Sequence, residues 1–425
     1  MSRVQLITMG CSKNRVDSEH LLRQLQHRGC EISPEGEDLV RGGVDEVIIN
    51  TCGFINDAKE ESIAAILEAV EAKKQGYIKR IRVFGCLSQR YMKELRQEIP
   101  EVDVFEGILT FDNTERLLTT PSHYAYLKIS EGCDRRCSYC AIPHIRGPHV
   151  SVPVEKLVEE AELLACQGVK ELIVVAQDTT FYGLDLYGKR RLADLLERLS
   201  LIRGIEWIRL HYSYPDGFPE DVLRIMAENP KICKYIDIPL QHSADKVLEA
   251  MRRSVDGRQT RRLVDRMRRM VPGVVLRTTM MVGHPGEGEA EFEDLLQFVR
   301  EYPFDRLGAF KYSEEDGTWG AAHLRDEIPP DVKQERYDRL MEVQSAISEK
   351  FNVARIGSNE RVLVDSFSDG VLVARSQGES PQVDGEILIG GENLSGGFVP
   401  AALVGKFADV KIKSAGEYDL LAELI

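Results

Sequence analysis

The sequence predicts an α/β protein with an open parallel sheet, a partial (βα)6 barrel and a small all-β barrel, in that order. Three observations support this fold class. Strand-like and helical patterns alternate through residues 1–120, and a second alternating series with six strand-like runs spans residues 121–355. From residue 356 to 425 the pattern changes to short β segments separated by Gly, Ser and Asp. Strand–helix alternation is typical of parallel sheets covered by helices, and the last pattern is typical of a small barrel.

The first domain, residues 1–120, is expected to form the open sheet. Apolar, β-branched runs predict strands at 4–10, 44–51, 80–85 and 102–108. Helical periodicity predicts helices at 16–27 and 57–74. Because strands and helices alternate here, the strands are expected to run parallel.

The second domain, residues 121–355, is expected to form the partial barrel. Its strands are predicted at 126–130, 171–177, 207–213, 235–241, 274–283 and 307–313. Helices are predicted at 154–167, 191–200, 220–229 and 289–302, and a charged connecting helix at 330–353. In barrels of this type the chemistry lies at the carboxyl ends of the strands.

The third domain, residues 356–425, is expected to be all β. Its strands are predicted at 360–366, 370–376, 385–391, 396–405 and 407–415.

Composition restricts where the chain works and what it binds. The 425 residues are 43% hydrophobic and 29% charged, with a formal net charge of −14. The chain as a whole is therefore not an electrostatic surface for nucleic acid, and a basic protein partner fits it better. The start, MSRVQLITMGC, has no export signal, and no apolar run approaches the roughly 18 residues that span a bilayer. We expect a cytoplasmic protein without a membrane partner.

Nine cysteines, an odd number, are expected to stay reduced in that compartment, so clustered ones indicate metal or redox chemistry. Cys133, Cys137 and Cys140 follow the first strand of the second domain. Three thiolates at this spacing can bind one face of a cubane iron–sulfur cluster and leave one iron open. A zinc site completed by His144 or His149 is the alternative, which we weight lower because the motif lies at the mouth of a barrel.

Three further cysteines, Cys11, Cys52 and Cys86, each follow a predicted strand of the first domain. Because the carboxyl ends of parallel strands gather at one edge of a sheet, these thiols are expected to meet in space. The remaining cysteines are interpreted as packing residues: Cys30, Cys166 and Cys233.

The motif at Cys133, Cys137 and Cys140, with the aromatic Tyr139, resembles the CxxxCxxC signature of the radical S-adenosylmethionine (SAM) superfamily. The resemblance implies a 4Fe-4S cluster whose open iron chelates SAM and cleaves it to a 5′-deoxyadenosyl radical. It implies no catalytic side chain. It also implies a set of cofactor-binding residues: Tyr139, Gln177, Gln241, Gly283 and Pro285. The last two lie in a segment that resembles the family's Gly-x-Pro-Gly-Glu element, with His284 in place of the usual Phe, and that also fits a tight turn.

The segments around the other triplet, 8–19, 50–54 and 85–90, resemble the N-terminal domain of the radical SAM methylthiotransferase family. The resemblance implies that Cys11, Cys52 and Cys86 hold a second 4Fe-4S cluster, which delivers sulfur. It implies two uses of SAM, as methyl donor and as radical source. It further implies that residues 356–425 form a TRAM-type barrel for substrate recognition.

Two branches of that family differ in substrate. One modifies N6-isopentenyladenosine in tRNA, and the other modifies the β-carbon of an aspartate on small-subunit ribosomal protein S-twelve. Segments 129–133, 141–143, 176–187 and 417–420 resemble the second branch, although in Ser151-Val152-Pro153 the family usually has Arg before the Pro. Residues 355–425 contain 11 Asp and Glu against 6 Lys and Arg, a charge of −5. An acidic barrel suits a basic ribosomal protein better than RNA.

The expected partners are therefore ribosomal protein S-twelve, an electron donor such as a flavodoxin or ferredoxin, and a sulfur source. Nucleic acid is not expected as the direct substrate, and the arginines between residues 261 and 269 are interpreted as a solvated helix face. The alternatives are the tRNA enzyme of the same family, a non-catalytic iron–sulfur scaffold and a zinc protein.

Overall fold

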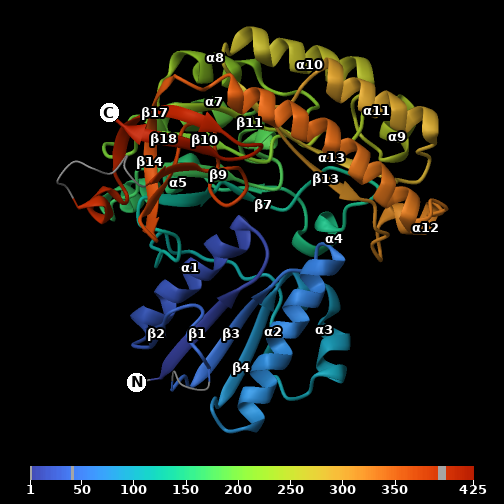
Figure 1. Cartoon of the computed structure of the whole chain (residues 1–425). Helices are drawn as coiled ribbons and strands as arrows, with labels where there is room; N and C mark the ends of the chain where they lie inside the picture. Colours follow the sequence, from blue (N-terminus) through green and yellow to red (C-terminus); the bar gives the residue numbers. More distant parts are fainter. Residues whose placement is uncertain (1, 40–42, 391–398) are drawn as a thin grey trace.

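The computed structural model describes residues 2–39, 43–390 and 399–425. An N-terminal α/β unit lies below a central α/β unit, and a C-terminal β-barrel lies beside the central unit (Figure 1). Within the described ranges, no helix has both the length and the apolar composition needed to cross a bilayer.

The N-terminal unit is built on a five-stranded parallel sheet in the order β2-β1-β3-β4-β5. Its strands are β1 (Arg3–Thr8), β2 (Glu31–Ser33), β3 (Glu46–Thr51), β4 (Arg80–Gly85) and β5 (Val104–Phe105). Helices α1 (Ser12–His27), α2 (Asn56–Lys74) and α3 (Cys86–Glu98) pack on it. Ile48 and Ile49 are both fully buried and lie in separate apolar clusters, because neighbouring strand residues face opposite sides of the sheet. Strand β2 was not predicted because three residues carry no recognisable pattern.

The central unit contains six parallel strands in the order β13-β12-β11-β10-β9-β6, which confirms the predicted fold class. They are β6 (Tyr124–Lys128), β9 (Glu171–Val175), β10 (Trp207–Leu210), β11 (Ile232–Asp237), β12 (Val275–Val282) and β13 (Arg306–Lys311). A short hairpin, β7 (Ser130–Glu131) and β8 (Val150–Ser151), follows β6. In the described chain β6 and β13 do not pair with each other, so the barrel is partial.

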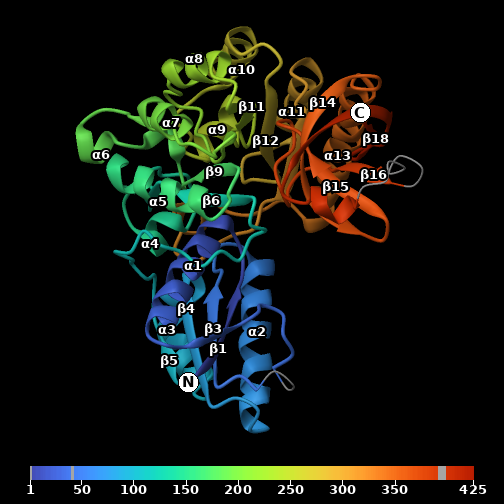
Figure 2. The ribbon, with the colours of Figure 1, turned by 90° about the vertical axis from the view of Figure 1, so that its left-hand side faces the viewer.

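Helices cover the outer side of these strands (Figures 1 and 2). The longer ones are α5 (Val154–Cys166), α7 (Leu192–Ser200), α8 (Glu220–Glu228), α10 (Gly257–Met270), α11 (Glu289–Glu301) and α13 (Pro330–Val353). The shorter ones are α4 (Ile142–Arg146), α6 (Leu184–Tyr187), α9 (Asp245–Ala250), α12 (Trp319–His323) and the 3-10 turn η1 (Thr179–Phe181). On β10, Ile208 and Leu210 face the apolar core under the helices, whereas Arg209 between them faces the barrel interior.

The arginines of α10 form the solvated face predicted from the sequence. Three of them pair with acids of neighbouring elements: Arg261 with Asp294 at 3.2 Å, Arg266 with Glu220 at 2.9 Å and Arg268 with Asp305 at 3.4 Å. These pairs are partly exposed, so each contributes little to stability.

The C-terminal unit is a closed five-stranded barrel in the order β14-β15-β16-β18-β17, as predicted for a small all-β domain. Its strands are β14 (Asn359–Ser368), β15 (Val371–Arg375), β16 (Ile387–Gly390), β17 (Phe407–Ala415) and β18 (Leu420–Leu424). The strand predicted at 396–405 is wrong for its described part. Residues 396–398 lie outside the described ranges, and η3 (Pro400–Leu403) is a 3-10 helix that starts at a proline, which donates no ladder hydrogen bond. Strand β18 was not predicted.

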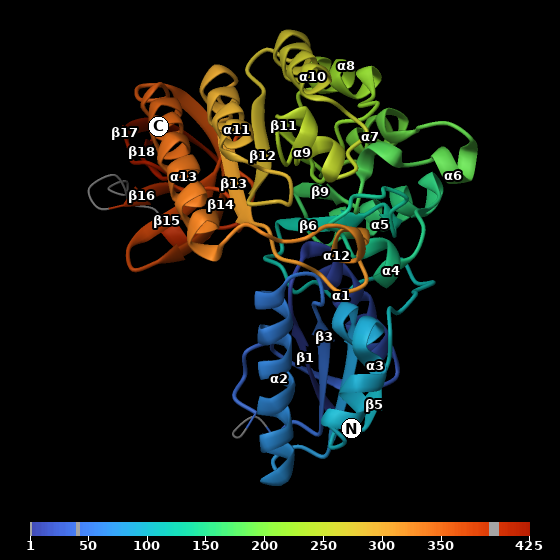
Figure 3. The ribbon, with the colours of Figure 1, turned by 90° about the vertical axis from the view of Figure 1, so that its right-hand side faces the viewer.

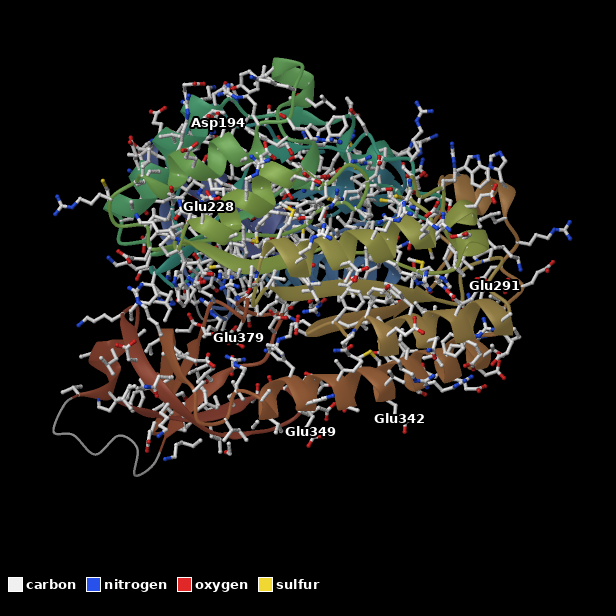
Figure 4. All side chains as sticks on the ribbon, turned by 90° about the horizontal axis from the view of Figure 1, so that it is seen from above. Asp194, Glu228, Glu291, Glu342, Glu349 and Glu379 are labelled. Atoms are coloured by element: carbon white, nitrogen blue, oxygen red, sulfur yellow. The ribbon has the colours of Figure 1, made fainter. Side chains whose placement is uncertain are left out.

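The end of β15 and the loop that follows it to β16 fix the C-terminal barrel to the interior of the partial barrel. Glu379 lies at this junction (Figure 4). The contacts are Glu171–Arg375 at 2.9 Å, Arg306–Glu379 at 3.0 Å, His211–Ser380 at 2.8 Å and Tyr235–Asp384 at 2.6 Å. Because Glu171 and Arg306 begin their strands, the loop covers the amino-terminal end of the partial barrel. The carboxyl ends of the strands therefore face the N-terminal unit.

Candidate active site between two cysteine triads

The six predicted cluster cysteines line one cavity of about 370 Å³ between the N-terminal unit and the carboxyl ends of the central strands. Cys11, Cys52 and Cys86 form what we call the N-terminal triad. Cys133, Cys137 and Cys140 form the central triad. The strands of the N-terminal sheet point toward the central unit, so the first triad faces the second (Figure 2).

The N-terminal triad forms because three neighbouring strands end at one level. Thr8 pairs with Asn50, and Thr51 pairs with Gly85, so the residues after β1, β3 and β4 are adjacent. Cys11 is the N-cap of α1 and Cys86 is the first residue of α3. The positive end of a helix favours a thiolate, which is the form that binds iron.

Gly10 lets the strands bring their cysteines close together. Its φ is +87°, and a Cβ atom there would lie 2.6 Å from Cys52 Cβ. With one 4Fe-4S cluster on each triad, as the family resemblance implies, we expect Gly10→Ala to displace Cys52 and to lower the iron bound after anaerobic reconstitution from about eight to about four atoms per chain. Gly29→Ala is a matched control, because Gly29 has φ +84° but no atom within 4 Å of a new Cβ. Full iron content in Gly10→Ala would contradict this role of the contact.

The central triad lies on the loop between β7 and α4. Gly132 begins the turn with φ +74°, and a Cβ atom there would lie 2.0 Å from the Pro148 carbonyl oxygen. The backbone N–H of Arg135 donates to Cys133 Sγ at 3.4 Å. The Arg253 guanidinium donates to Cys137 Sγ at 3.6 Å. These contacts hold the thiols at the cavity in a fixed loop.

Of the predicted cofactor residues, Tyr139, Gln177 and Gln241 line the cavity, and Gly283 and Pro285 do not. The latter two lie in the turn after β12, where the Gly283 N–H donates to Glu287 Oε1 at 2.9 Å.

His284, between them in sequence, places its Nε2 atom 3.2 Å from the hydroxyl of Ser138 in the cysteine loop. The turn after β12 therefore contacts the loop that carries the central triad and helps to hold that loop in place.

Several buried polar atoms in the cavity have no hydrogen-bond partner among the described residues. They are Gln177 Oε1, Gln241 Oε1 and Arg253 Nε. Gln241 also adopts φ +74°, a conformation that is strained for a side-chain-bearing residue. Because buried, unpartnered polar atoms cost free energy, this wall of the cavity fits a polar ligand such as SAM.

The surroundings of the thiols differ within the N-terminal triad. Burial raises the pKa of Cys86 to about 12 and also raises that of Cys52. Burial acts on Cys11 in the same direction, but Lys13 and Arg146 outweigh it and lower the Cys11 pKa. In the central triad, burial raises the pKa of Cys133 to about 12. Binding of iron to these thiols would therefore be coupled to the release of protons.

Arg146, on α4 of the central unit, contacts Cys86 of the N-terminal triad, and sequence analysis did not identify it. Its Nε donates to Cys86 Sγ at 3.2 Å, its Nη2 to Asn14 Oδ1 at 2.6 Å and its Nη1 to Glu131 Oε1 at 2.8 Å. Glu131 also accepts a hydrogen bond from Gln177 Nε2 at 2.9 Å. The only sequence signal for Arg146 was its position shortly after the central motif.

The zinc alternative is not supported by the donors at the cavity. His144 is exposed, and the buried His149 lies 3.1 Å from the Ser151 hydroxyl; neither lines the cavity. Among the residues that the structure describes, no group of three Cys, His, Asp or Glu side chains is arranged to hold a single metal ion. The six thiols fit iron–sulfur clusters, which spread their ligands over several iron atoms.

Comparisons with known proteins identify the family. Residues 3–107 match the model described as Uncharacterized protein family UPF0004, residues 127–299 match the Radical SAM superfamily and residues 356–425 match the TRAM domain. The chain is 48% identical over 438 residues to "Ribosomal protein uS12 methylthiotransferase RimO" of Bacteroides fragilis, which covers 99% of each chain. The protein of the same name from Porphyromonas gingivalis is 50% identical over 441 residues, covering 100% of this chain and 99% of that protein. The chain belongs to the RimO family.

As a member of the RimO family, the chain is a radical SAM methylthiotransferase, which confirms the family predicted from its motifs. Solved structures share its fold. The TM-score is 0.55, at 14% identity, with the radical SAM methyltransferase TsrM from Kitasatospora setae, covering 73% of this chain and 75% of that one. With the cobalamin-dependent SAM radical enzyme OxsB it is 0.52, at 13% identity, covering 82% and 56%. At these identities the likeness shows the fold alone.

Proposed function

We propose that this RimO-family enzyme adds a methylthio group to the β-carbon of an aspartate on ribosomal protein uS12, in the cytoplasm. The observation that carries the proposal is the single cavity lined by both cysteine triads. Replacing an unactivated C–H bond by a C–S bond requires a radical source and a sulfur donor at the same carbon. The relatives named for uS12 methylthiotransferase activity also align with the whole chain.

We assign one 4Fe-4S cluster to each triad. Cys133, Cys137 and Cys140 would hold the cluster that, with SAM bound, would supply the radical chemistry. Tyr139, Gln177 and Gln241 would contact SAM. Arg253 would bind the SAM carboxylate, because its Nη1 lies 3.4 Å from the Tyr139 hydroxyl and it pairs with no Asp or Glu of the described chain. A flavodoxin or ferredoxin would supply the electron, and a separate sulfur source would replenish the N-terminal triad.

The N-terminal unit forms one wall of the cavity. Figure 3 shows the N-terminal unit below α12 and the segment that precedes it. At this side of the interface, Lys59 of α2 and Arg90 of α3 pair with Glu315 of the central unit at 3.0 and 2.9 Å. Glu315 is only 5% exposed. These contacts hold the N-terminal unit over the strand ends, where a carbon radical must be kept from solvent.

The three parts of the chain would divide the work. We assign residues 1–120 to sulfur delivery, 121–355 to radical formation and 356–425 to substrate recognition. The charge of −5 over residues 355–425 supports a basic protein as the substrate rather than RNA.

The test offers reconstituted enzyme, reductant and SAM either uS12 or hypomodified tRNA, and follows each by mass spectrometry. We expect a methylthio mass gain on an aspartate of uS12 and none on tRNA. A gain on tRNA alone would refute the proposed substrate, and 5′-deoxyadenosine without either product would refute the substrate but retain the radical chemistry.

A further inference from the structure

Lys13 is a buried cation in the cavity with no carboxylate partner in the part of the chain that the structure describes. It lies in the first turn of α1, two residues after Cys11, and its side chain lines the cavity. The residue is 8% exposed. Its Nζ lies 3.3 Å from the centroid of the Tyr212 ring, and it pairs with no Asp or Glu among the described residues.

Other cations in or near the cavity pair with carboxylates. Lys128 pairs with Glu131 at 2.8 Å, and Arg146 pairs with the same carboxylate at 2.8 Å. Arg135 pairs with Asp178 at 2.8 Å. Lys13 has the Cys11 thiol beside it but no carboxylate partner in the described ranges, and it lines the cavity. A buried cation is costly unless negative groups balance it, so the cavity beside Lys13 favours an anionic ligand.

The ring that holds Lys13 comes from the central unit and is itself fixed. Tyr212 follows β10 and adopts φ +57°, a strained conformation. Its N–H donates to Asp237 Oδ2 at 2.9 Å, and its carbonyl accepts from the Thr179 N–H at 3.0 Å. The backbone on both sides of the strained residue is therefore held, and the ring stays opposite Lys13 across the interface between the two units.

Arg253 is the other cavity cation that pairs with no Asp or Glu in the described ranges, and it lies beside Cys137 of the central triad. The reaction proposed above brings two carboxylates into the cavity, one on SAM and one on the target aspartate. Arg253 adjoins the triad assigned to SAM, whereas Lys13 adjoins Cys11 of the triad assigned to sulfur delivery. The two cations thus match the two carboxylates.

We infer that Lys13 binds the side-chain carboxylate of the aspartate that receives the methylthio group. This inference rests on the proposed function and names a residue that determines its specificity. The β-carbon is bonded directly to the carboxyl carbon, so an ion pair with the carboxylate places the reacting carbon beside the N-terminal triad. The same pair selects aspartate over neutral residues and over an uncharged nucleobase.

The test is a double-mutant cycle with reconstituted holoenzyme under anaerobic conditions. The affinity of wild type and Lys13→Met is measured by fluorescence anisotropy for uS12 and for uS12 with the target aspartate changed to asparagine. In wild type we expect the asparagine change to weaken binding roughly 10- to 100-fold, because it leaves a buried charge unpaired. In Lys13→Met we expect both ligands to bind equally weakly. Lys13→Arg should retain the preference for aspartate.

Lys79→Met is the matched control, because Lys79 is in the same unit and its side chain is 82% exposed. It should behave as wild type. An unchanged preference for aspartate in Lys13→Met would overturn the inference, and so would loss of iron or of the N-terminal cluster's EPR signal in that variant, since Lys13 would then serve the cluster. If wild type itself does not modify uS12, the proposed function fails instead.

Discussion

Cys86→Ala is expected to lower methylthio transfer by roughly 10³-fold or more while the variant still cleaves SAM. Cys86 belongs to the N-terminal triad, so its loss removes a ligand of the cluster that we assign to sulfur delivery and leaves the central triad complete. Product mass and 5′-deoxyadenosine should be measured in the same reactions, together with iron content. Cys86→Ser tests whether sulfur itself matters, because serine keeps an acceptor for Arg146 Nε, which lies 3.2 Å from Cys86 Sγ.

Two other cysteine variants serve as comparisons for Cys86→Ala. Cys137→Ala should lose both methylthio transfer and SAM cleavage, because it removes one of the three thiols to which we assign the cluster that binds SAM. Cys166→Ala should retain both, since Cys166 is exposed on α5 away from the cavity. If Cys86→Ala transferred methylthio groups normally, the N-terminal triad would not hold the sulfur donor.

Glu171→Gln is expected to destabilise the apoprotein by about 3–5 kcal/mol. Glu171 is fully buried between Arg209 at 2.7 Å and Arg375 at 2.9 Å, and its neutralisation leaves both guanidinium groups without their shared charge. The melting temperature, followed by circular dichroism, should fall by roughly 10 °C. Glu423→Gln is the control, because the Glu423–Lys413 pair is partly exposed and contributes under about 1 kcal/mol.

The same site predicts how stability depends on pH. Burial alone would raise the pKa of Glu171, but Arg375 and Arg209 outweigh burial and lower it. The folded state therefore holds this carboxylate charged, and its contribution is present above the pKa of an unfolded glutamate. It is lost as pH falls through the lower pKa of the folded state. An unchanged melting temperature in Glu171→Gln at neutral pH would contradict this account.

The sequence was informative where one local pattern governs the structure. The six central strands and the repeated cysteine contexts could be recognised because apolar runs and motif spacing are local properties. It was weaker for short or irregular elements. Strands β2 and β18 are three and five residues long, and the described part of the segment predicted as a strand at 396–405 contains a 3-10 helix instead.

Some residues of the site could also be predicted from local sequence patterns, and others could not. Strand-end position was enough to predict that Cys11, Cys52 and Cys86 meet, because parallel strands align their carboxyl ends. The cations Lys13, Arg146 and Arg253 were not predicted, because their roles depend on partners from distant elements: Tyr212 for Lys13, Cys86 and Glu131 for Arg146, and Cys137 for Arg253.

The sequence by itself determined the α/β order of the chain, the six cysteines and, through their resemblance, the family. Only the tertiary structure decided that both triads open into one cavity and that Gly283 and Pro285 lie outside it. It also showed that Lys13 is buried with no Asp or Glu partner among the described residues. The physical reason is that motifs and periodicity are encoded along the chain, whereas burial and charge pairing are set by residues that folding brings together from separate strands and helices.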